Sequence, residues 1–422
     1  MRALTVVPAS TGSAALVDMP EPSTTDGEIL IATHAIGLCG TDREILDGKY
    51  GRAPAGQERL ILGHESIGRV NEAPPESGFS AGDWVVGIVR RPDPVPCSSC
   101  RVGEWDMCKN GRYTEHGIAG LHGFGAERYR SFARYLVKVD PALGELGVLL
   151  EPTSIVAKAW EHVRRTGERA HWEPKRVLVV GAGPIGILAA LLGVQQGLEV
   201  HVLDRSDTGP KPALVRALGA SFHASGIAAL GRDWDIIFEC TGAPALFFDV
   251  LQAAGPDGIV CLTGVSSGGR TMSVDPGILN REFVLENLVV LGSVNANRRH
   301  YEQAADSRAG PCPYWHSRPR PRTVTAFLRP ARLHENGGPR RPRARRHPRS
   351  SVGPRNQSGL ECSARERTER LDGHPREARR HHARRAALPG HSRRQGASRV
   401  GGVSFERRPR RVLSRRARYF RA

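Results

Sequence analysis

The stretch RVLVVGAGPIG, residues 176–186, constrains the fold of this chain more than any other feature. Its first five residues are typical of a buried parallel strand, and the pattern G-x-G-x-x-G follows at once. The next residues, ILAALLGVQQG, predict a helix that ends at Gly197. Glycines at such a turn let a pyrophosphate approach the backbone and the helix N-terminus, where free N–H groups favour anions. The predicted dinucleotide-binding residues of this turn are Gly181, Gly183, Pro184, Ile185 and Gly186.

An acidic residue follows at the spacing that a dinucleotide site requires. Asp204 ends the strand-like LEVHVLD, 18 residues after Gly186, where a carboxylate accepts hydrogen bonds from the adenosine ribose. A carboxylate favours NAD because it repels a 2′-phosphate, whereas Arg205 would clamp that phosphate if the acid turned away. The sequence therefore leaves the choice between NAD and NADP open.

The segments after this site alternate between strand and helix patterns. WDIIFECTG, ALFFDVLQAAG, IVCLTGV and FVLENLVVLGSV fit further β/α units, which predicts an α/β, doubly wound domain over residues 171–305. Val265 and Asn295 follow two of the strand ends and are predicted to border the cofactor. The alternative is a doubly wound domain that binds another nucleotide.

Three separate motifs of the first half carry metal-ligating side chains. Cys39 lies in GLCGTD, His64 and Glu65 in GHE, and Glu151 in LLEP. Zinc accepts thiolate, imidazole and carboxylate ligands, and a catalytic zinc keeps one position open for water or substrate. Each residue alone has a structural explanation, as a small core residue, a structural histidine or a helix N-terminal acid. Together, upstream of a dinucleotide domain, they predict a catalytic zinc site.

These motifs, in this order, resemble the zinc-dependent medium-chain alcohol and polyol dehydrogenases. More narrowly, VRRPDPVPC, GEWDMCKNGRYTEHGIAGLHGF, LLEPTSIVAKAW and GSVNANRRHYE resemble the glucose 1-dehydrogenase branch. The resemblance covers about residues 1–305. It implies a GroES-like β-barrel catalytic domain over residues 1–170 and a Rossmann domain over 171–305. It also implies a final segment that returns to complete the catalytic domain, and a homo-oligomer formed through edge strands such as FVLENLVVLGSV.

The resemblance assigns roles at the first-half site. Cys39, His64 and Glu151 would hold the catalytic zinc, with Glu65 as an alternate or neighbouring ligand. The Thr41 hydroxyl would lie near the substrate oxygen. The implied reaction is zinc-assisted, NAD(P)-dependent oxidation of D-glucose at C1 to the lactone. The alternative within the superfamily is a dehydrogenase of other polyols or secondary alcohols.

A sugar substrate needs several polar partners, because each buried hydroxyl without one costs ~1–3 kcal/mol. Glu115 lies where the resemblance places a sugar-binding acid. His300 and Asn297, polar residues just past a strand end, and Glu151 are further substrate-binding candidates. The structural alternatives are a salt bridge for Glu115 and a plain turn for Asn295 and Asn297.

Three more cysteines have metal-ligand spacing. Cys97, Cys100 and Cys108 predict a structural zinc. The resembling superfamily usually has a fourth cysteine where this chain has Pro94, and Asp93 is the nearest replacement. The alternative is a lobe that no longer binds metal. This cysteine usage suits a reducing compartment, and the sequence shows neither a secretory signal nor an uninterrupted membrane span, so we expect a cytoplasmic protein.

Residues 306–422 differ in composition from everything before them. They hold 32 Arg, no Lys and 8 acids, a net charge of +24, whereas residues 1–305 carry −6. Their 14 Leu, Val or Phe, with no Ile, fall well below the ~20% that a folded domain usually needs. We therefore predict a largely disordered, basic tail.

Two explanations account for this tail. The first is a reading-frame shift near codons 305–310. Out-of-frame translation of GC-rich DNA produces a composition rich in Arg, Pro, Ala and Gly, as this tail has. A genuine tail would instead bind nucleic acid non-specifically through phosphate contacts, beside an inactive dehydrogenase. We favour the frame shift, and expect poor stability and little activity because the returning segment is lost.

Overall fold

The computed structural model describes residues 1–266, 268 and 271–309. All of them belong to one compact unit, Met1–Leu333. The predicted tail lies outside the described residues from residue 310 onward. None of the helices in the described part of the chain combines the length and apolar character that a membrane crossing requires.

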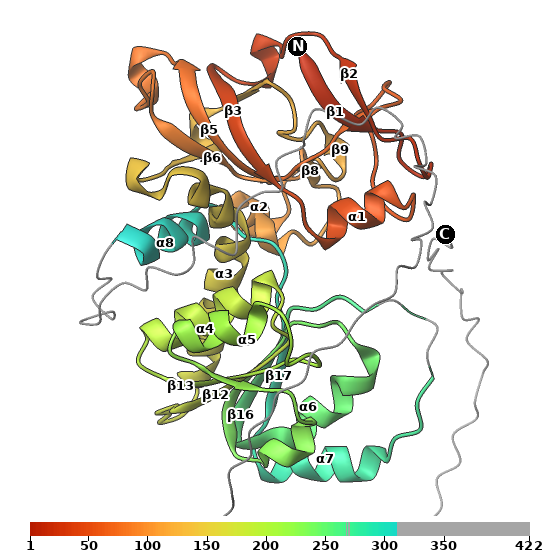
Figure 1. The fold of residues 1–422 in the computed structure, drawn as a ribbon, viewed down its shortest axis with the longest axis vertical. Helices are drawn as coiled ribbons and strands as arrows, with labels where there is room; N and C mark the ends of the chain where they lie inside the picture. Colours follow the sequence, from red (N-terminus) through yellow and green to blue (C-terminus); the bar gives the residue numbers. More distant parts are fainter. Residues whose placement is uncertain (267, 269–270, 310–422) are drawn as a thin grey trace, which may run out of the picture. The chain divides into compact units, whose positions relative to one another are not determined.

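The two halves of the described chain have different secondary structure (Figure 1). The strands of the first half are β1 (Arg2–Val6), β2 (Ala15–Asp18), β3 (Ile29–Gly37), β4 (Leu60–Ile61), β5 (Glu65–Glu72), β6 (Trp84–Gly87), β7 (Arg90–Arg91), β8 (Thr114–His116), β9 (Gly120–Leu121), β10 (Arg128–Ser131) and β11 (Leu136–Lys138). Its helices are α1 (Gly40–Leu46), α2 (Ser98–Arg101) and α3 (Leu150–Gly167).

Strands and helices alternate in the second half. The strands are β12 (Arg176–Val180), β13 (Glu199–Leu203), β14 (Ser221–His223), β15 (Trp234–Glu239), β16 (Ala254–Leu262) and β17 (Val289–Gly292). The helices are α4 (Pro184–Gln195), α5 (Lys211–Ala217), α6 (Phe247–Ala253), α7 (Pro276–Leu285) and α8 (Arg298–Ala309).

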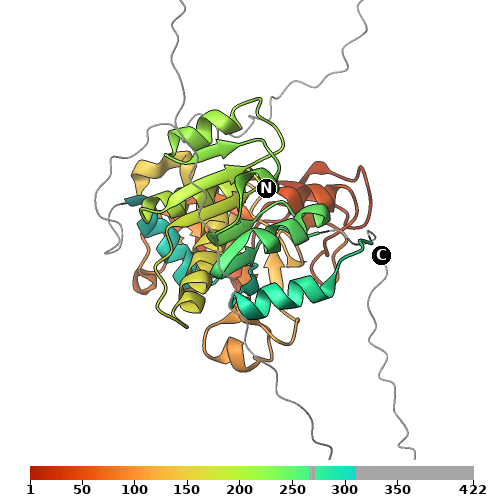
Figure 2. The ribbon, with the colours of Figure 1, turned by 90° about the horizontal axis from the view of Figure 1, so that it is seen from below.

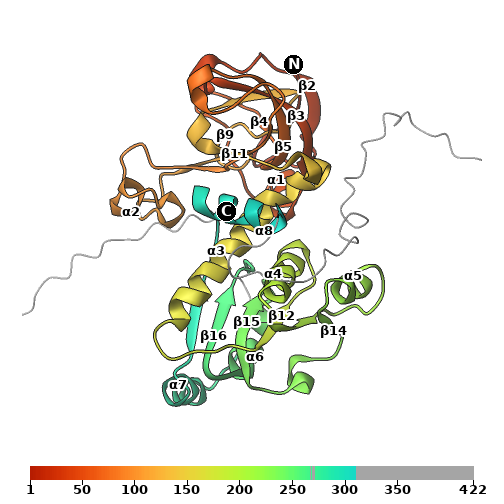
Figure 3. The same cartoon turned by 90° about the vertical axis from the view of Figure 1, so that its left-hand side faces the viewer.

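The second half is built on a six-stranded parallel sheet with the order β14-β13-β12-β15-β16-β17. Helices α3, α4 and α5 pack on one face and α6 on the other, and Figure 3 shows helices on both sides of the sheet. Strands buried on both faces explain the apolar run of 177–180. Strand order reverses between β12 and β15, whose carboxyl ends form the usual ligand crevice of such sheets.

The first half is a set of antiparallel sheets, of which the largest has the order β10-β3-β5-β6-β11. Alternating side chains of β3 and β5 fill the core; Ile29, Ile31 and Val70 pack with Phe124 and Tyr129. In the view from below in Figure 2, the second half, coloured green, lies in front of the red and orange first half. In the long β3–β5 ladder, β3 ends two residues before Cys39 and β5 begins at Glu65, directly after His64. The ladder therefore brings the two metal-ligand motifs together.

The chain returns to the first half earlier than the predicted boundary at residue 305. Ala296, Tyr301 and Ala304 are buried in one cluster with Ile67 and Val86. Strand β17 ends at Gly292, and the segment after it crosses over so that α8 packs against α3. Residues 296–305 therefore pack with the first half, because their apolar side chains find their core there.

Candidate active site

Cys39 occupies the N-cap position of α1, where local hydrogen bonds fix its thiol. Its Sγ accepts a hydrogen bond from the backbone N–H of Thr41 at 3.3 Å, and its own N–H donates to Asp42 Oδ2 at 2.9 Å. This reciprocal capping box directs the sulfur toward His64, whose Nε2 lies 3.1 Å away.

Asp42 orients His64 from the opposite side of the imidazole ring. His64 Nδ1 lies 3.5 Å from Asp42 Oδ1, and both side chains are buried. A carboxylate behind one ring nitrogen leaves the other as a lone-pair donor for a metal. Burial by itself lowers the pKa of His64, but hydrogen bonds and charge from Asp42 and Cys39 raise it well above its ordinary value. Sequence reasoning missed Asp42, although its place at the third position of the helix was the available signal.

Glu65, rather than Glu151, completes the group of candidate ligands. One ligand atom each from Cys39, His64 and Glu65 lies within 4.8 Å of the others. Glu151, predicted as the third ligand, is not in this group. It is buried at the start of α3 and lies close enough for the charges of His64 and Glu65 to affect its pKa. Glu65, predicted as an alternate ligand, is therefore the carboxylate of this group, and zinc binding by Glu151 stays a prediction.

The carboxylates around this group favour a cation. Burial raises the pKa of Glu65 to about 7, with His64 opposing the shift and Asp42 adding to it. Burial likewise raises the pKa of Glu151 to about 8, and Glu65, Asp42 and Glu115 add to that shift. A divalent ion would stabilise all of these negative charges at once, so the donor set fits a zinc ion.

The glycines of the predicted dinucleotide turn have separate functions. Gly181 has a φ of 105°, and a Cβ on Gly186 would lie 1.8 Å from the carbonyl oxygen of Gly181. Gly183 is the N-cap of α4, and a Cβ there would meet no atom within 4 Å. Pro184 begins the helix and Ile185 follows it. The turn is therefore tight at both ends and open in the middle, as a pyrophosphate site requires.

Asp204 follows β13 beside this turn and is already engaged by protein groups. Its Oδ2 accepts a hydrogen bond from Ala182 N at 2.8 Å and lies 2.9 Å from Lys211 Nζ. Lys211, the first residue of α5, was not found from the sequence. Arg205 is exposed beside it, and Val265 is 87% exposed.

Glu115, the predicted sugar-binding acid, is buried at the junction of the two halves. Arg90 pairs with it through Nε and Nη2, both 3.0 Å from Oε1. Asn295, predicted to border the cofactor, donates from Nδ2 to the same oxygen at 3.0 Å. The salt-bridge alternative for Glu115 is thus present, but it is internal rather than on the surface.

Asn297 and His300 are buried, and their predicted contact with a substrate stays a prediction. Asn297 Nδ2 donates to Asp106 Oδ1 at 2.8 Å. The His300 side chain is 0% exposed; its Nδ1 accepts from Asn297 N at 3.1 Å, and its Nε2 faces Glu161 at 3.4 Å. Their polar atoms serve internal contacts because the crossover segment packs into the first half.

Cys97, Cys100 and Cys108 do come together, with their sulfur atoms within 4.8 Å of one another. Asp93, the predicted fourth ligand, is not in the group. Its carboxylate accepts from Val95 N at 2.8 Å and pairs with Arg112 at 3.3 Å. The structure therefore supplies three of the four predicted ligands, with the acid turned to other partners.

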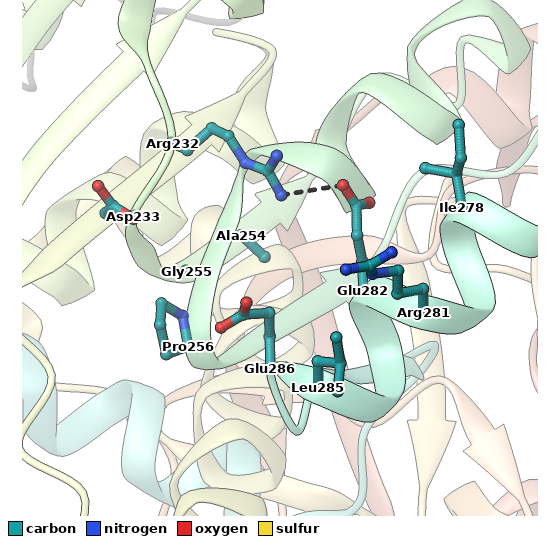
Figure 4. A pocket seen from close by; sticks show the side chains of 10 residues that line it. All are labelled: Arg232, Asp233, Ala254, Gly255, Pro256, Ile278, Arg281, Glu282, Leu285 and Glu286. Atoms are coloured by element: carbon teal, nitrogen blue, oxygen red, sulfur yellow. Dashed lines mark hydrogen bonds and ion pairs between the residues drawn. The ribbon is translucent and has the colours of Figure 1, made fainter. Parts of the chain in front are cut away.

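A cavity of about 430 Å³ lies away from these groups (Figure 4). It includes residues at the beginning of β15 and β16, whereas the Gly181 turn follows the opposite, carboxyl end of β12. Arg232 and Glu282 form an ion pair of 3.1 Å across it. Its lining is Arg232, Asp233, Ala254, Gly255, Pro256, Ile278, Arg281, Glu282, Leu285 and Glu286. It contains none of the predicted site residues.

Two family models match nearly all of the described chain. The alcohol dehydrogenase GroES-like domain matches residues 25–141, and the glucose dehydrogenase C-terminus matches 144–318. They confirm the predicted fold class, a GroES-like domain followed by a doubly wound one.

Curated relatives and solved structures agree with these models. Glucose 1-dehydrogenase of Methanocella arvoryzae is 40% identical over 314 residues, 72% of this chain and 88% of the relative. That of Thermoproteus tenax is 40% identical over 308 residues, 72% of this chain and 86% of the relative. The structure of Haloferax mediterranei glucose dehydrogenase in complex with NADP, Zn and gluconolactone superposes with a TM-score of 0.68 at 33% identity, over 73% of this chain and 89% of that one.

Proposed function

The chain belongs to the glucose dehydrogenase family of zinc-dependent alcohol dehydrogenases, and we propose from this premise that it oxidises D-glucose at C1 to the lactone with NAD or NADP. The single observation that carries the proposal is the group of Cys39, His64 and Glu65, with Asp42 behind the histidine. The relatives and the Haloferax complex support the substrate class.

Cys39, His64 and Glu65 would hold the zinc, and Glu151, whose pKa the charges of His64 and Glu65 affect, would be an alternate ligand. When bound, zinc would supply a Lewis acid for the sugar hydroxyl and the nicotinamide would supply a hydride acceptor for C1. Asp42 keeps the proton of His64 on Nδ1, so that Nε2 stays available as a ligand. The backbone N–H of Thr41 bonds the Cys39 sulfur, and the Thr41 hydroxyl would carry the substrate proton toward solvent.

Glu115 would bind a hydroxyl of the sugar. Arg90 and Asn295 hold its carboxylate in a fixed orientation. The Glu115 oxygen that Arg90 and Asn295 do not contact would accept a hydroxyl of a polyhydroxylated substrate, whereas a simple alcohol would leave that oxygen without this partner.

The Gly181–Gly186 turn would bind the pyrophosphate of the cofactor. Asp204 would accept the ribose hydroxyls of NAD, whereas Lys211 and Arg205 would face the 2′-phosphate of NADP. Asp204 pairs with Lys211. If this pair opens, Asp204 would be free to bind the ribose of NAD and Lys211 to bind the 2′-phosphate of NADP, so the site would accept both cofactors.

Strand β17 supports the further proposal of a homo-oligomer. It forms one edge of the six-stranded sheet, and its residues are only partly buried. An edge strand offers unpaired backbone groups to a second copy.

A substrate panel with the full chain tests the function. Glucose, galactose, sorbitol, threonine and ethanol are offered with NAD and with NADP, and reduced cofactor is measured by absorbance. We expect glucose to be preferred and activity to be lost in Cys39→Ser. Preference for sorbitol or a simple alcohol would favour the alternative within the superfamily.

A further inference from the structure

Asp106 stands at the centre of a set of buried polar contacts that joins three distant segments. It lies in the turn Trp105–Met107. Its Oδ1 accepts a hydrogen bond from Asn297 Nδ2 at 2.8 Å, and its Oδ2 lies 2.8 Å from Lys158 Nζ. The side chains of Lys158 and Asp106 are 1% and 0% exposed. A fully buried ion pair of this kind adds little net stability, but the loss of one partner leaves an uncompensated buried charge.

A first connection runs from Asp106 to Glu115 through Arg90. Arg90 Nη1 donates to the main-chain oxygen of Asp106 at 3.2 Å. Its Nε and Nη2 both lie 3.0 Å from Glu115 Oε1. The planar guanidinium thus fixes the distance between the Asp106 turn and the Glu115 carboxylate.

A second connection reaches Glu115 through the crossover segment. Lys158, paired with Asp106, donates to the carbonyl oxygen of Val294 at 2.9 Å. Asn295, the next residue, has a φ of 60° and donates to Glu115 Oε1 at 3.0 Å. Because the chain is anchored on both sides, by Lys158 at Val294 and by Asp106 at Asn297, Asn295 is held in this sparsely populated conformation.

The contacts named for Glu115 all fall on Oε1. Arg90 and Asn295 therefore fix the rotation of the carboxylate and leave Oε2 for a ligand hydroxyl. The two connections close a ring, since both begin at Asp106 and both end on the same oxygen atom.

We propose that Asp106 is a positioning residue for sugar recognition, which sets the direction of Glu115 Oε2 through Arg90 and through segment 294–297. The proposal rests on the proposed function, in which Glu115 binds a sugar hydroxyl. Asp106 acts through Arg90, Lys158 and Asn297, so its removal changes sugar binding while the cofactor turn stays intact.

Two variants of the full chain test the proposal. Asp106→Asn keeps an acceptor for Asn297 but leaves Lys158 as an unpaired buried cation. The double variant Asp106→Asn/Lys158→Met removes that cation as well, so thermal stability recovers at least in part. We expect the KM for glucose to rise about tenfold in both variants, while the KM for the cofactor stays within about twofold.

A matched control lies in the same lobe. Glu104 is partly exposed and pairs with Arg299 at 3.6 Å, so Glu104→Gln perturbs the lobe without touching the ring. We expect unchanged KM values for sugar and cofactor. A glucose KM that returns to the wild-type value together with stability in the double variant would show a purely structural role and overturn the proposal, as would an unchanged KM in Asp106→Asn.

Failure of the positioning role can be distinguished from failure of the proposed function. If neither the wild-type chain nor a chain rebuilt with an in-frame continuation after residue 305 oxidises an aldose, the proposed function fails and the positioning role is judged from crystal structures of the wild-type and Asp106→Asn chains. A Glu115 carboxylate that rotates in the variant supports the positioning role. One that keeps its orientation overturns it.

Discussion

A Cβ atom on Gly37 would lie 2.1 Å from Oε2 of Glu65, across the ladder in which the two residues are paired. The absence of a side chain at Gly37 therefore gives Glu65 the room to reach the group of Cys39 and His64. This relationship makes a glycine that contacts no ligand a determinant of the candidate metal site.

Replacing Gly37 with alanine should displace Glu65 and weaken the site. We expect zinc affinity and kcat/KM to fall about tenfold or more, as for other residues that support metal ligands. Gly226→Ala is the control, because its backbone is extended and a Cβ there meets no atom within 4 Å. Equal zinc affinity in Gly37→Ala and wild type would mean that Glu65 is not a ligand.

Zinc content separates the two candidate metal groups. We expect two zinc ions per chain, measured by atomic emission after dialysis, and one each in Cys39→Ser and Cys100→Ser. The two single variants should differ in stability, since a structural zinc contributes to folding and a catalytic one contributes much less. A wild-type chain with one zinc that Cys39→Ser removes would show that the three-cysteine lobe is empty.

Glu161 on α3 binds side chains of the returning helix α8. We therefore expect the stability that this contact contributes to fall at low pH. Burial alone would raise the pKa of Glu161, but hydrogen bonds from Arg299 and Gln303 and the charge of His300 lower it to about 2. Because the folded-state pKa is lowered, the stability from this carboxylate is present above its unfolded-state pKa of ~4.3 and is lost as pH falls toward the folded value.

Thermal melts of wild type and Glu161→Gln between pH 3 and 8 measure this contribution. The variant should melt at a lower temperature at pH 7, and the two curves should approach each other as the pH falls below ~4. Glu302→Gln, which removes a partly exposed pair with Arg298 within α8, is the control. A constant difference between variant and wild type at every pH would exclude a charge effect.

The dinucleotide site was predictable because its signals are local. The strand, the glycine turn, the helix and Asp204 follow one another within 29 residues, from Arg176 to Asp204. Each part has its own physical requirement, and none depends on distant packing. The structure therefore only added Lys211 as the partner of Asp204.

The metal and substrate residues were harder to predict because they come from separate segments. Cys39 and His64 were identified correctly as neighbours, but the sequence does not say whether Glu65 or Glu151 reaches them first. Asn297 meets Asp106, 191 residues away in sequence. Such pairs depend on how the crossover segment packs, so the sequence alone does not reveal the protein partners of a polar residue after a strand end.

Cofactor preference should respond to Lys211. Removing it in Lys211→Ala takes one positive charge from the expected 2′-phosphate position, so the KM for NADP should rise about five- to tenfold while that for NAD changes less. Arg216→Ala is the matched control on α5, where Arg216 stacks on Phe222 instead. An equal effect on both cofactors would place Lys211 outside phosphate recognition and leave Arg205 as the remaining candidate.

We expect the composition change after residue 305 to lower the activity of the chain, even though the candidate site residues are present. The 314 residues aligned with the Methanocella arvoryzae relative make up 88% of that relative, so its remaining 12% has no aligned counterpart here.

If a frame shift is the cause, translating the other two forward frames past codon 305 should give an apolar-periodic continuation of roughly 50 residues, enough for a helix and several strands. A chain rebuilt with that continuation should melt at a higher temperature and oxidise glucose faster than the chain as it stands. Absence of such a continuation in both frames would contradict the frame shift, and a normal family rate from the present chain would show that the returning segment is dispensable.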